Sequence, residues 1–116
     1  MATPNIVNVT SITGALITGN VTGTDTVIID VPADKLYKIN TIHVSAHTSG
    51  SSLVHISIST DNGSNYQWLT SNMSVPGFSA ILVLANPIYM DETDLMRISG
   101  GTDLDYFISY EIIDDA

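Results

Sequence analysis

The residues of this sequence that could carry out chemistry are its three histidines and a set of acidic turns. If residues 48–52 form a symmetric loop between antiparallel strands at 36–46 and 53–59, His43 lies opposite His55 on the outward face, with the Cβ atoms about 5 Å apart. Two such imidazoles could bind a metal ion or respond to protonation together. A zinc site needs further ligands that this pattern does not supply. We therefore interpret the pair as solvated side chains of a hairpin, with the metal or proton-sensitive site as the alternative.

The acidic residues gather in turns, where calcium is the ion that carboxylate and carbonyl oxygens would bind. Residues 61–65 begin like a calcium loop but lack the later bidentate glutamate, so that motif fails. The turn at 91–94, Asp-Glu-Thr-Asp, remains a candidate for calcium. Aspartate is also common in turns because its side chain bonds nearby backbone groups. We assign no metal ligand and no cofactor from the sequence.

Known catalytic motifs are absent from the sequence. It has no cysteine, no Gly-x-Ser-x-Gly, no His-Glu-x-x-His and no glycine-rich phosphate loop ahead of a helix. Its carboxylates lie in polar turns, whereas general acid–base catalysis needs one in an apolar environment. We predict that the protein is not an enzyme and has no catalytic residues.

Two aromatic residues, Tyr66 and Trp68, share one parity of a strand predicted at 66–73. On an exposed face they could stack on a sugar, as in carbohydrate-binding modules. Such a pair more often belongs to a core or to a protein interface. Both interpretations stay open from the sequence.

Composition argues against two classes of partner. The chain has 12 acidic and 3 basic residues, a net charge of −9, and such a surface repels the phosphate backbone of nucleic acids. No apolar run approaches the length of a bilayer span, and the N-terminus lacks the pattern of a signal peptide. We expect neither a nucleic acid nor a membrane as a partner.

Alternating apolar and polar residues indicate strands along most of the chain. Eight or so strands separated by close turns predict an all-β fold, an antiparallel β-sandwich of jelly-roll or immunoglobulin-like type. The phase of the strand at 36–46 changes midway, which predicts a β-bulge near Asn40 and Thr41. The last three strands, 78–84, 95–99 and 104–113, follow one another through short polar turns. We expect these three to pair in succession in one antiparallel sheet.

Residues 1–25 form a separate N-terminal strand or arm segment, ahead of a β-sandwich domain at 26–116. This segment is rich in Thr, Asn and Gly and poor in charge. It either pairs within its own domain or adds as a strand to a neighbouring subunit. We predict contact with another subunit. The candidate interface residues are the larger apolar ones: Ile6, Val7, Val9, Ile12, Leu16 and Ile17.

A combination of short motifs links residues 30–113 to a known family. The motifs are Val31-Pro32-Ala33, Leu36-Tyr37-Lys38-Ile39-Asn40, Val75-Pro76, Pro87-Ile88-Tyr89, Leu95-Met96-Arg97, Asp103-Leu104 and Ser109-Tyr110-Glu111. Over this range the chain resembles the small accessory virion structural proteins of tailed bacteriophages, of capsid decoration or tail and fibre type. That family offers no catalytic residues.

The resemblance implies a structural virion protein, foremost a capsid decoration (cement) protein that stabilises the head surface through multivalent contacts. A tail or fibre subunit is the alternative within the virion, and a carbohydrate-binding module is the alternative outside it. The partners implied are its own copies, with a homotrimer as one arrangement, and the major capsid protein or other virion subunits. The location implied is the virion, after synthesis in the cytoplasm of the host bacterium.

Overall fold

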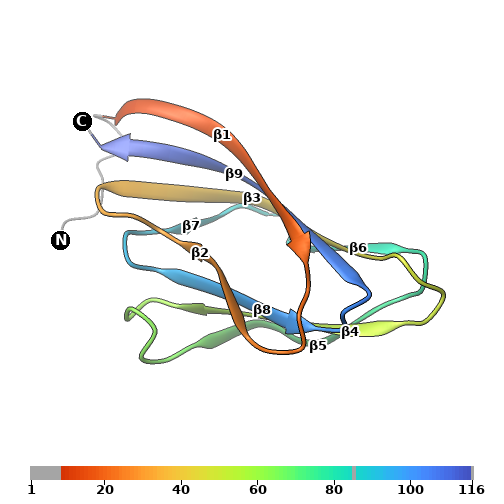
Figure 1. The fold of residues 1–116 in the computed structure, drawn as a ribbon. Coiled ribbons are helices and arrows are strands. Elements are labelled where there is room, and N and C mark those ends of the chain that lie inside the picture. Colours follow the sequence, from red (N-terminus) through yellow and green to blue (C-terminus); the bar gives the residue numbers. More distant parts are fainter. Residues whose placement is uncertain (1–8, 85, 116) are drawn as a thin grey trace.

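A computed structural model describes residues 9–84 and 86–115, and these residues form nine β-strands and no helix (Figure 1). The strands are β1 (Val9–Asn20), β2 (Thr26–Asp30), β3 (Lys35–Ala46), β4 (Ser52–Ser59), β5 (Gln67–Val75), β6 (Ala80–Leu84), β7 (Ile88–Met90), β8 (Leu95–Gly100) and β9 (Leu104–Asp115). No helix of the described residues is long and apolar enough to cross a membrane.

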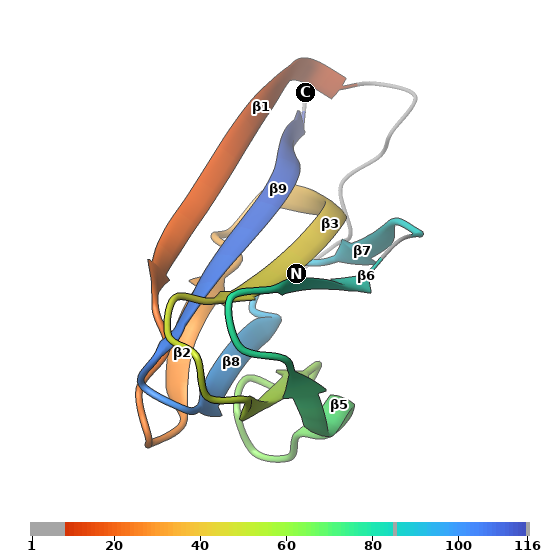
Figure 2. The same cartoon turned by 90° about the vertical axis from the view of Figure 1, so that its right-hand side faces the viewer.

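The strands form two antiparallel sheets that face each other as a sandwich (Figures 1 and 2). Sheet A has the order β1-β9-β3-β6, with β7 also paired to β3, and sheet B has the order β2-β8-β4-β5. Most connections cross from one sheet to the other, so neighbours within a sheet are distant in sequence. This winding is that of a jelly roll. The predicted all-β sandwich is confirmed.

The core lies between the two sheets and consists of aliphatic side chains from alternate strand positions. On sheet A these include Ile39 and Ile42 of β3 and Ile108 of β9, all fully buried. Sheet B contributes Ile56 of β4 and Met96 of β8, also fully buried. Period-two alternation therefore identified the buried faces of these strands, because successive side chains of a strand point to opposite faces.

The predicted bulge in the third strand is confirmed. Against β9, Ile39 pairs with Tyr110 and Thr41 pairs with Ser109, which leaves Asn40 as the extra residue. The bulge restores the inward phase, so that both Ile39 and Ile42 reach the core.

The pairing predicted for the last three strands is wrong. β6 pairs with β3 and β9 lies between β1 and β3, all in sheet A, whereas β8 lies in sheet B between β2 and β4. Alternation shows which face of a strand is buried, but both sheets bury one face against the same core. The pattern therefore does not distinguish the sheet to which a strand belongs.

The prediction that a hairpin places His43 opposite His55 is also wrong. The loop after β3 crosses from sheet A to sheet B, so β3 and β4 are not neighbours. His43 lies between Phe107 and Leu82 in sheet A. His55 lies opposite Ser99 in sheet B. The two imidazoles are on different sheets and cannot form a shared site.

Candidate functional site

The edge strand β1 is the first feature that could support function. It pairs with β9 from Val9 opposite Asp115 to Asn20 opposite Asp105, with a register shift only between Val9 and Ser11. Its other edge has no partner strand among the described residues. Natural edge strands are usually protected by charge, proline, shortness or bulges. The twelve-residue sequence of β1 contains no charged residue and no proline.

The edges of sheet B contrast with β1. The edge strand β2 has five residues and a register shift between Val27 and Ile29. The opposite edge strand, β5, has two register shifts against β4. Both features disfavour the addition of a further strand. β1 is therefore the long, regular edge of this sandwich.

Both ends of β1 are anchored to the rest of the domain. Near its start the Ser11 hydroxyl donates to the Asp114 carboxylate at 2.9 Å, and Lys35 pairs with the same carboxylate. Hydrogen bonds from Lys35 and Ser11 lower the pKa of Asp114. At its end the Asn20 side-chain amide donates to the carbonyl oxygens of Thr102 at 2.9 Å and Leu104 at 2.8 Å. The strand is thus an integral part of its own sheet, which is one of the two arrangements considered for it.

An exposed apolar surface adjoins this edge on the outer side of sheet A. We call it the sheet A face and define it by five residues on four strands: Ile12 and Leu16 of β1, Phe107 of β9, Leu82 of β6 and Tyr89 of β7. Leu16 is 63% exposed and Ile12 56% exposed. His43 stands between Phe107 and Leu82 in the register of sheet A. In the register Leu16 lies diagonal to Phe107, whereas Lys38 and Glu111 stand between Tyr89 and β1. Isolated exposed apolar residues are ordinary, but several on one face of a sheet indicate a contact surface.

The six candidate interface residues predicted for the N-terminal segment do not all lie on one surface. Ile12 and Leu16 belong to the sheet A face, whereas the partly buried Ile17 packs against the core. Val9 begins β1 opposite Asp115. Ile6 and Val7 lie outside the described residues.

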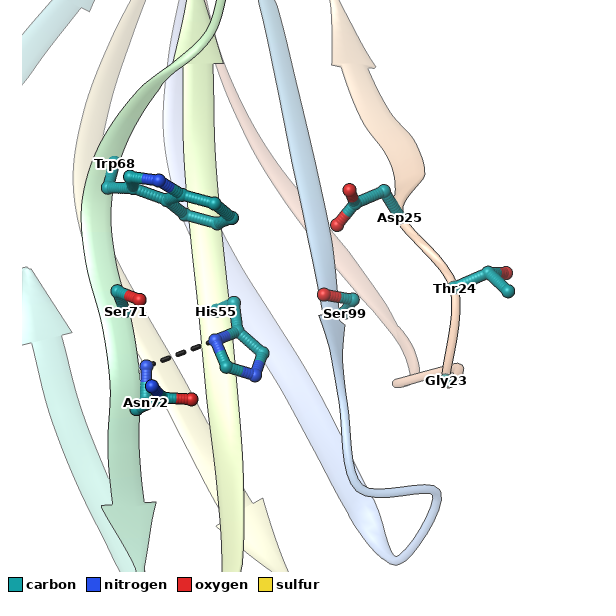
Figure 3. A pocket seen from close by; sticks show the side chains of 8 residues that line it. All are labelled: Gly23, Thr24, Asp25, His55, Trp68, Ser71, Asn72 and Ser99. Carbon is teal, nitrogen blue, oxygen red and sulfur yellow. Dashed lines mark hydrogen bonds between the residues drawn. The ribbon is translucent and has the colours of Figure 1, made fainter.

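A polar hollow on the outer side of sheet B is the second feature (Figure 3). Trp68 of β5 is 57% exposed there, and its ring meets the His55 ring edge-on, with centroids 6.2 Å apart at an angle of 63°. His55 Nδ1 accepts a hydrogen bond of 3.0 Å from the backbone N–H of Asn72. We call this depression the Trp68 hollow. It is also lined by Gly23, Thr24, Asp25, Ser71 and Ser99.

A β-bulge in β5 shapes the Trp68 hollow. Opposite β4, Val54 pairs with Met73 and Ile56 pairs with Thr70, so two residues of β5 face the single His55. Asn72 takes a left-handed backbone conformation, with a φ of 55°. Asparagine tolerates this region better than most residues. The bulge turns this part of β5 toward His55, which supplies the acceptor for the displaced amide.

Tyr66 lies beside Arg97 rather than beside an open surface. The guanidinium carbon of Arg97 is 3.7 Å from the centroid of the Tyr66 ring. Arg97 also donates from Nε to the Ser57 hydroxyl at 2.9 Å and lies 3.6 Å from a carboxylate oxygen of Asp25. Arg97 therefore covers one face of the Tyr66 ring. Trp68 is the more exposed of the two aromatic residues predicted to stack on a glycan.

The acidic turn at 91–94 directs its carboxylates toward backbone amides. Asp91 accepts from the N–H of Glu92 at 2.8 Å, Glu92 accepts from the N–H of Asp34 at 2.9 Å, and Asp94 accepts from the N–H of Asp91 at 2.9 Å. Burial, together with the charge of Asp91, raises the pKa of Asp94. The described part of the chain contains no group of three or more His, Cys, Asp or Glu residues that could hold a metal ion. These hydrogen bonds to backbone amides are the role that acidic side chains commonly have in turns.

Sequence reasoning missed most of the Trp68 hollow. Asp25, His55, Asn72 and Ser99 come from four separate segments that only the fold brings together. One sequence signal was available: the run Thr70-Ser71-Asn72 interrupts the alternation of the predicted strand, as a bulge does.

Comparisons with known proteins identify a similar fold but no family. No family model and no curated protein matches the sequence. A similar solved structure comes from Bacillus endospore appendages, described as a novel family of disulfide-linked pili. That chain is 12% identical, with a TM-score of 0.58, and the match covers 94% of this chain and 90% of the other. At this identity the likeness extends to the fold alone.

Proposed function

We propose that this protein is a structural subunit of a phage virion, a capsid decoration protein that associates with its own copies through β1 and the sheet A face. The observation that supports self-association is the long, uncharged and regular edge of β1. The proposed role in a virion rests on the resemblance of residues 30–113 to accessory virion proteins. The role is mechanical and has no catalytic step.

The edge of β1 favours another strand as its partner. Backbone N–H and C=O groups on that edge are matched best by the backbone of a neighbouring chain, and each hydrogen bond so formed contributes about 0.5–1.5 kcal/mol net. The sheet A face adds apolar area beside the same edge. Its exposed residues Ile12 and Leu16 lie on β1 itself, so one partner could cover both features.

Charge constrains how copies meet. A net charge of −9 on each chain opposes close association in general. β1 carries no charge, and Lys38 pairs with Glu111 at 3.8 Å farther into sheet A. Contact through this side of the molecule therefore brings fewer unpaired like charges together than contact through the acidic turns.

The presence of many copies would let individually weak contacts stabilise the particle. A decoration protein is present in many copies on a symmetric shell, so modest contacts to neighbours and to capsid subunits combine into strong reinforcement. A tail or fibre subunit would use the same edge and face in an open or threefold arrangement, and this remains the second candidate.

The fold similarity is compatible with an assembling subunit, since the similar chain comes from a pilus. The pili of that comparison are disulfide-linked, whereas this sequence has no cysteine. Association of these copies would therefore depend on non-covalent contacts.

Sedimentation equilibrium of the purified chain tests the proposed self-association. We expect concentration-dependent oligomers that Leu16→Lys weakens, because the new charge lies beside the β1 edge. Leu53→Lys is the matched control: Leu53 is 46% exposed on sheet B, and the charge change is the same. A monomeric wild-type chain, or equal effects of both variants, would contradict the proposal.

Immunogold labelling of purified particles of the encoding phage tests the location. Label spread over the head supports capsid decoration, and label confined to the tail supports the second candidate. Particles without label would refute a structural role in the virion.

A further inference from the structure

The Trp68 hollow combines an exposed aromatic ring with several polar side chains directed into the same space (Figure 3). Asp25 comes from the turn before β2, His55 from β4, Asn72 and Trp68 from β5, and Ser99 from β8. Binding sites for small molecules typically pair apolar or aromatic surface with a few placed polar groups.

Trp68 provides the apolar part. It is the single tryptophan of the chain and is 57% exposed, because it points away from the core on the outer face of its sheet. The neighbouring residue Leu69 packs toward that core. The edge-on contact with His55 supports the indole from one side and leaves much of its surface accessible.

The polar groups offer both donors and acceptors. Because His55 Nδ1 accepts from the N–H of Asn72, the imidazole carries its proton on Nε2, which is a donor. Asp25 offers carboxylate oxygens, and the side-chain amide of Asn72 offers a donor and an acceptor. Hydroxyl groups, which donate and accept, are the ligand groups that fit such a set.

Three other ligand classes fit less well. A phosphate or other anion would meet the carboxylate of Asp25 on a chain with a net charge of −9. A cation would meet the Nε2–H of His55 and the nearby Arg97, which lies 3.6 Å from Asp25. A wholly apolar ligand would leave the polar side chains of the hollow without hydrogen bonds.

We propose that the Trp68 hollow binds a neutral sugar ring at the end of a glycan. The apolar C–H face of the sugar stacks on Trp68, and its hydroxyl groups bond to Asp25, Asn72 and His55. The hollow lies on sheet B, on the side opposite the sheet A face. Sugar binding is thus independent of the proposed self-association, and copies joined through sheet A would present their hollows outward.

Tryptophan fluorescence tests this proposal directly, because Trp68 is the only source of that signal. The probes are the methyl glycosides of glucose, galactose, mannose and N-acetylglucosamine, titrated into the full chain. We expect a saturable change with at least one of them, with a dissociation constant on the order of 1 mM. The absence of a saturable change with all four would overturn the proposal.

Two variants distinguish a site formed by specific side chains from nonspecific contact with the indole of Trp68. Asn72→Gly keeps the left-handed backbone and removes the amide side chain, and Asp25→Ala removes the carboxylate. Each should weaken binding by about tenfold, the loss expected for one hydrogen bond to a bound ligand. Phe78→Ala is the control, since Phe78 is 72% exposed but does not line the hollow, and binding should be unchanged.

Two further results would overturn the proposal. One is equal sugar affinity of wild type, Asn72→Gly and Asp25→Ala, with folding verified by circular dichroism. The other is saturation by tetramethylammonium but by none of the sugars, which would identify a cation site.

Discussion

Arg97 should be the surface side chain whose removal destabilises sheet B most. It donates to Ser57 at 2.9 Å, lies 3.7 Å above the Tyr66 ring and is 3.6 Å from Asp25. The hydrogen bond contributes about 1 kcal/mol, and the cation–π contact about 0.5–1 kcal/mol. The partly exposed ion pair contributes a few tenths of a kcal/mol. We expect Arg97→Ala to lower the free energy of unfolding by about 2 kcal/mol.

Urea denaturation followed by circular dichroism measures this loss, which corresponds to a decrease in Tm of about 8 °C for a domain of this size. Arg97→Lys keeps the charge but loses the planar guanidinium, so it should recover only part of the loss. A double-mutant cycle with Tyr66→Leu should give a coupling energy of about 0.5–1 kcal/mol. A loss below about 0.5 kcal/mol for Arg97→Ala, or no coupling to Tyr66, would refute the interpretation.

Three further predictions concern the core, a close backbone contact and pH. Ile56→Ala removes a fully buried side chain and should cost about 2–5 kcal/mol in urea denaturation, whereas Leu53→Ala, at an exposed position, should cost under about 1 kcal/mol. Gly77→Ala would place a Cβ 2.0 Å from the Ser49 carbonyl oxygen and should lower Tm clearly, while Gly14→Ala, with open space around it, should not. Hydrogen bonds from Asn65, and then from Ser59, lower the pKa of Asp61 to about 2. The ionised carboxylate stabilises the fold above about pH 4. This stabilisation is lost as the pH falls through about 2. The difference in free energy of unfolding between wild type and Asp61→Ala should therefore shrink over that pH range.

The strands could be predicted from the sequence because their buried faces follow simple alternation. Leu104, Ile108 and Tyr110 share one parity and are all buried. The bulge at Asn40 was also predictable, since the inward phase changes there. The turn predicted at residues 61–64 joins β4 to β5, with positive φ at Asn62 and Gly63.

The assignment of strands to sheets could not be predicted in the same way. The prediction that His43 faces His55 failed because it assumed that a short loop joins paired strands, whereas this loop crosses between the sheets. The Trp68 hollow depends on the same topology. Trp68 itself was recognised from the sequence, but Asp25, His55 and Asn72 become its neighbours only after β2, β8, β4 and β5 are in register.

A cryo-electron microscopy map of the assembled form would show whether copies associate through β1. We predict that the free edge of β1 pairs with a strand of a neighbouring subunit and that Ile12 and Leu16 are covered by that neighbour. A map in which β1 faces solvent while copies meet through sheet B or the acidic turns would contradict it.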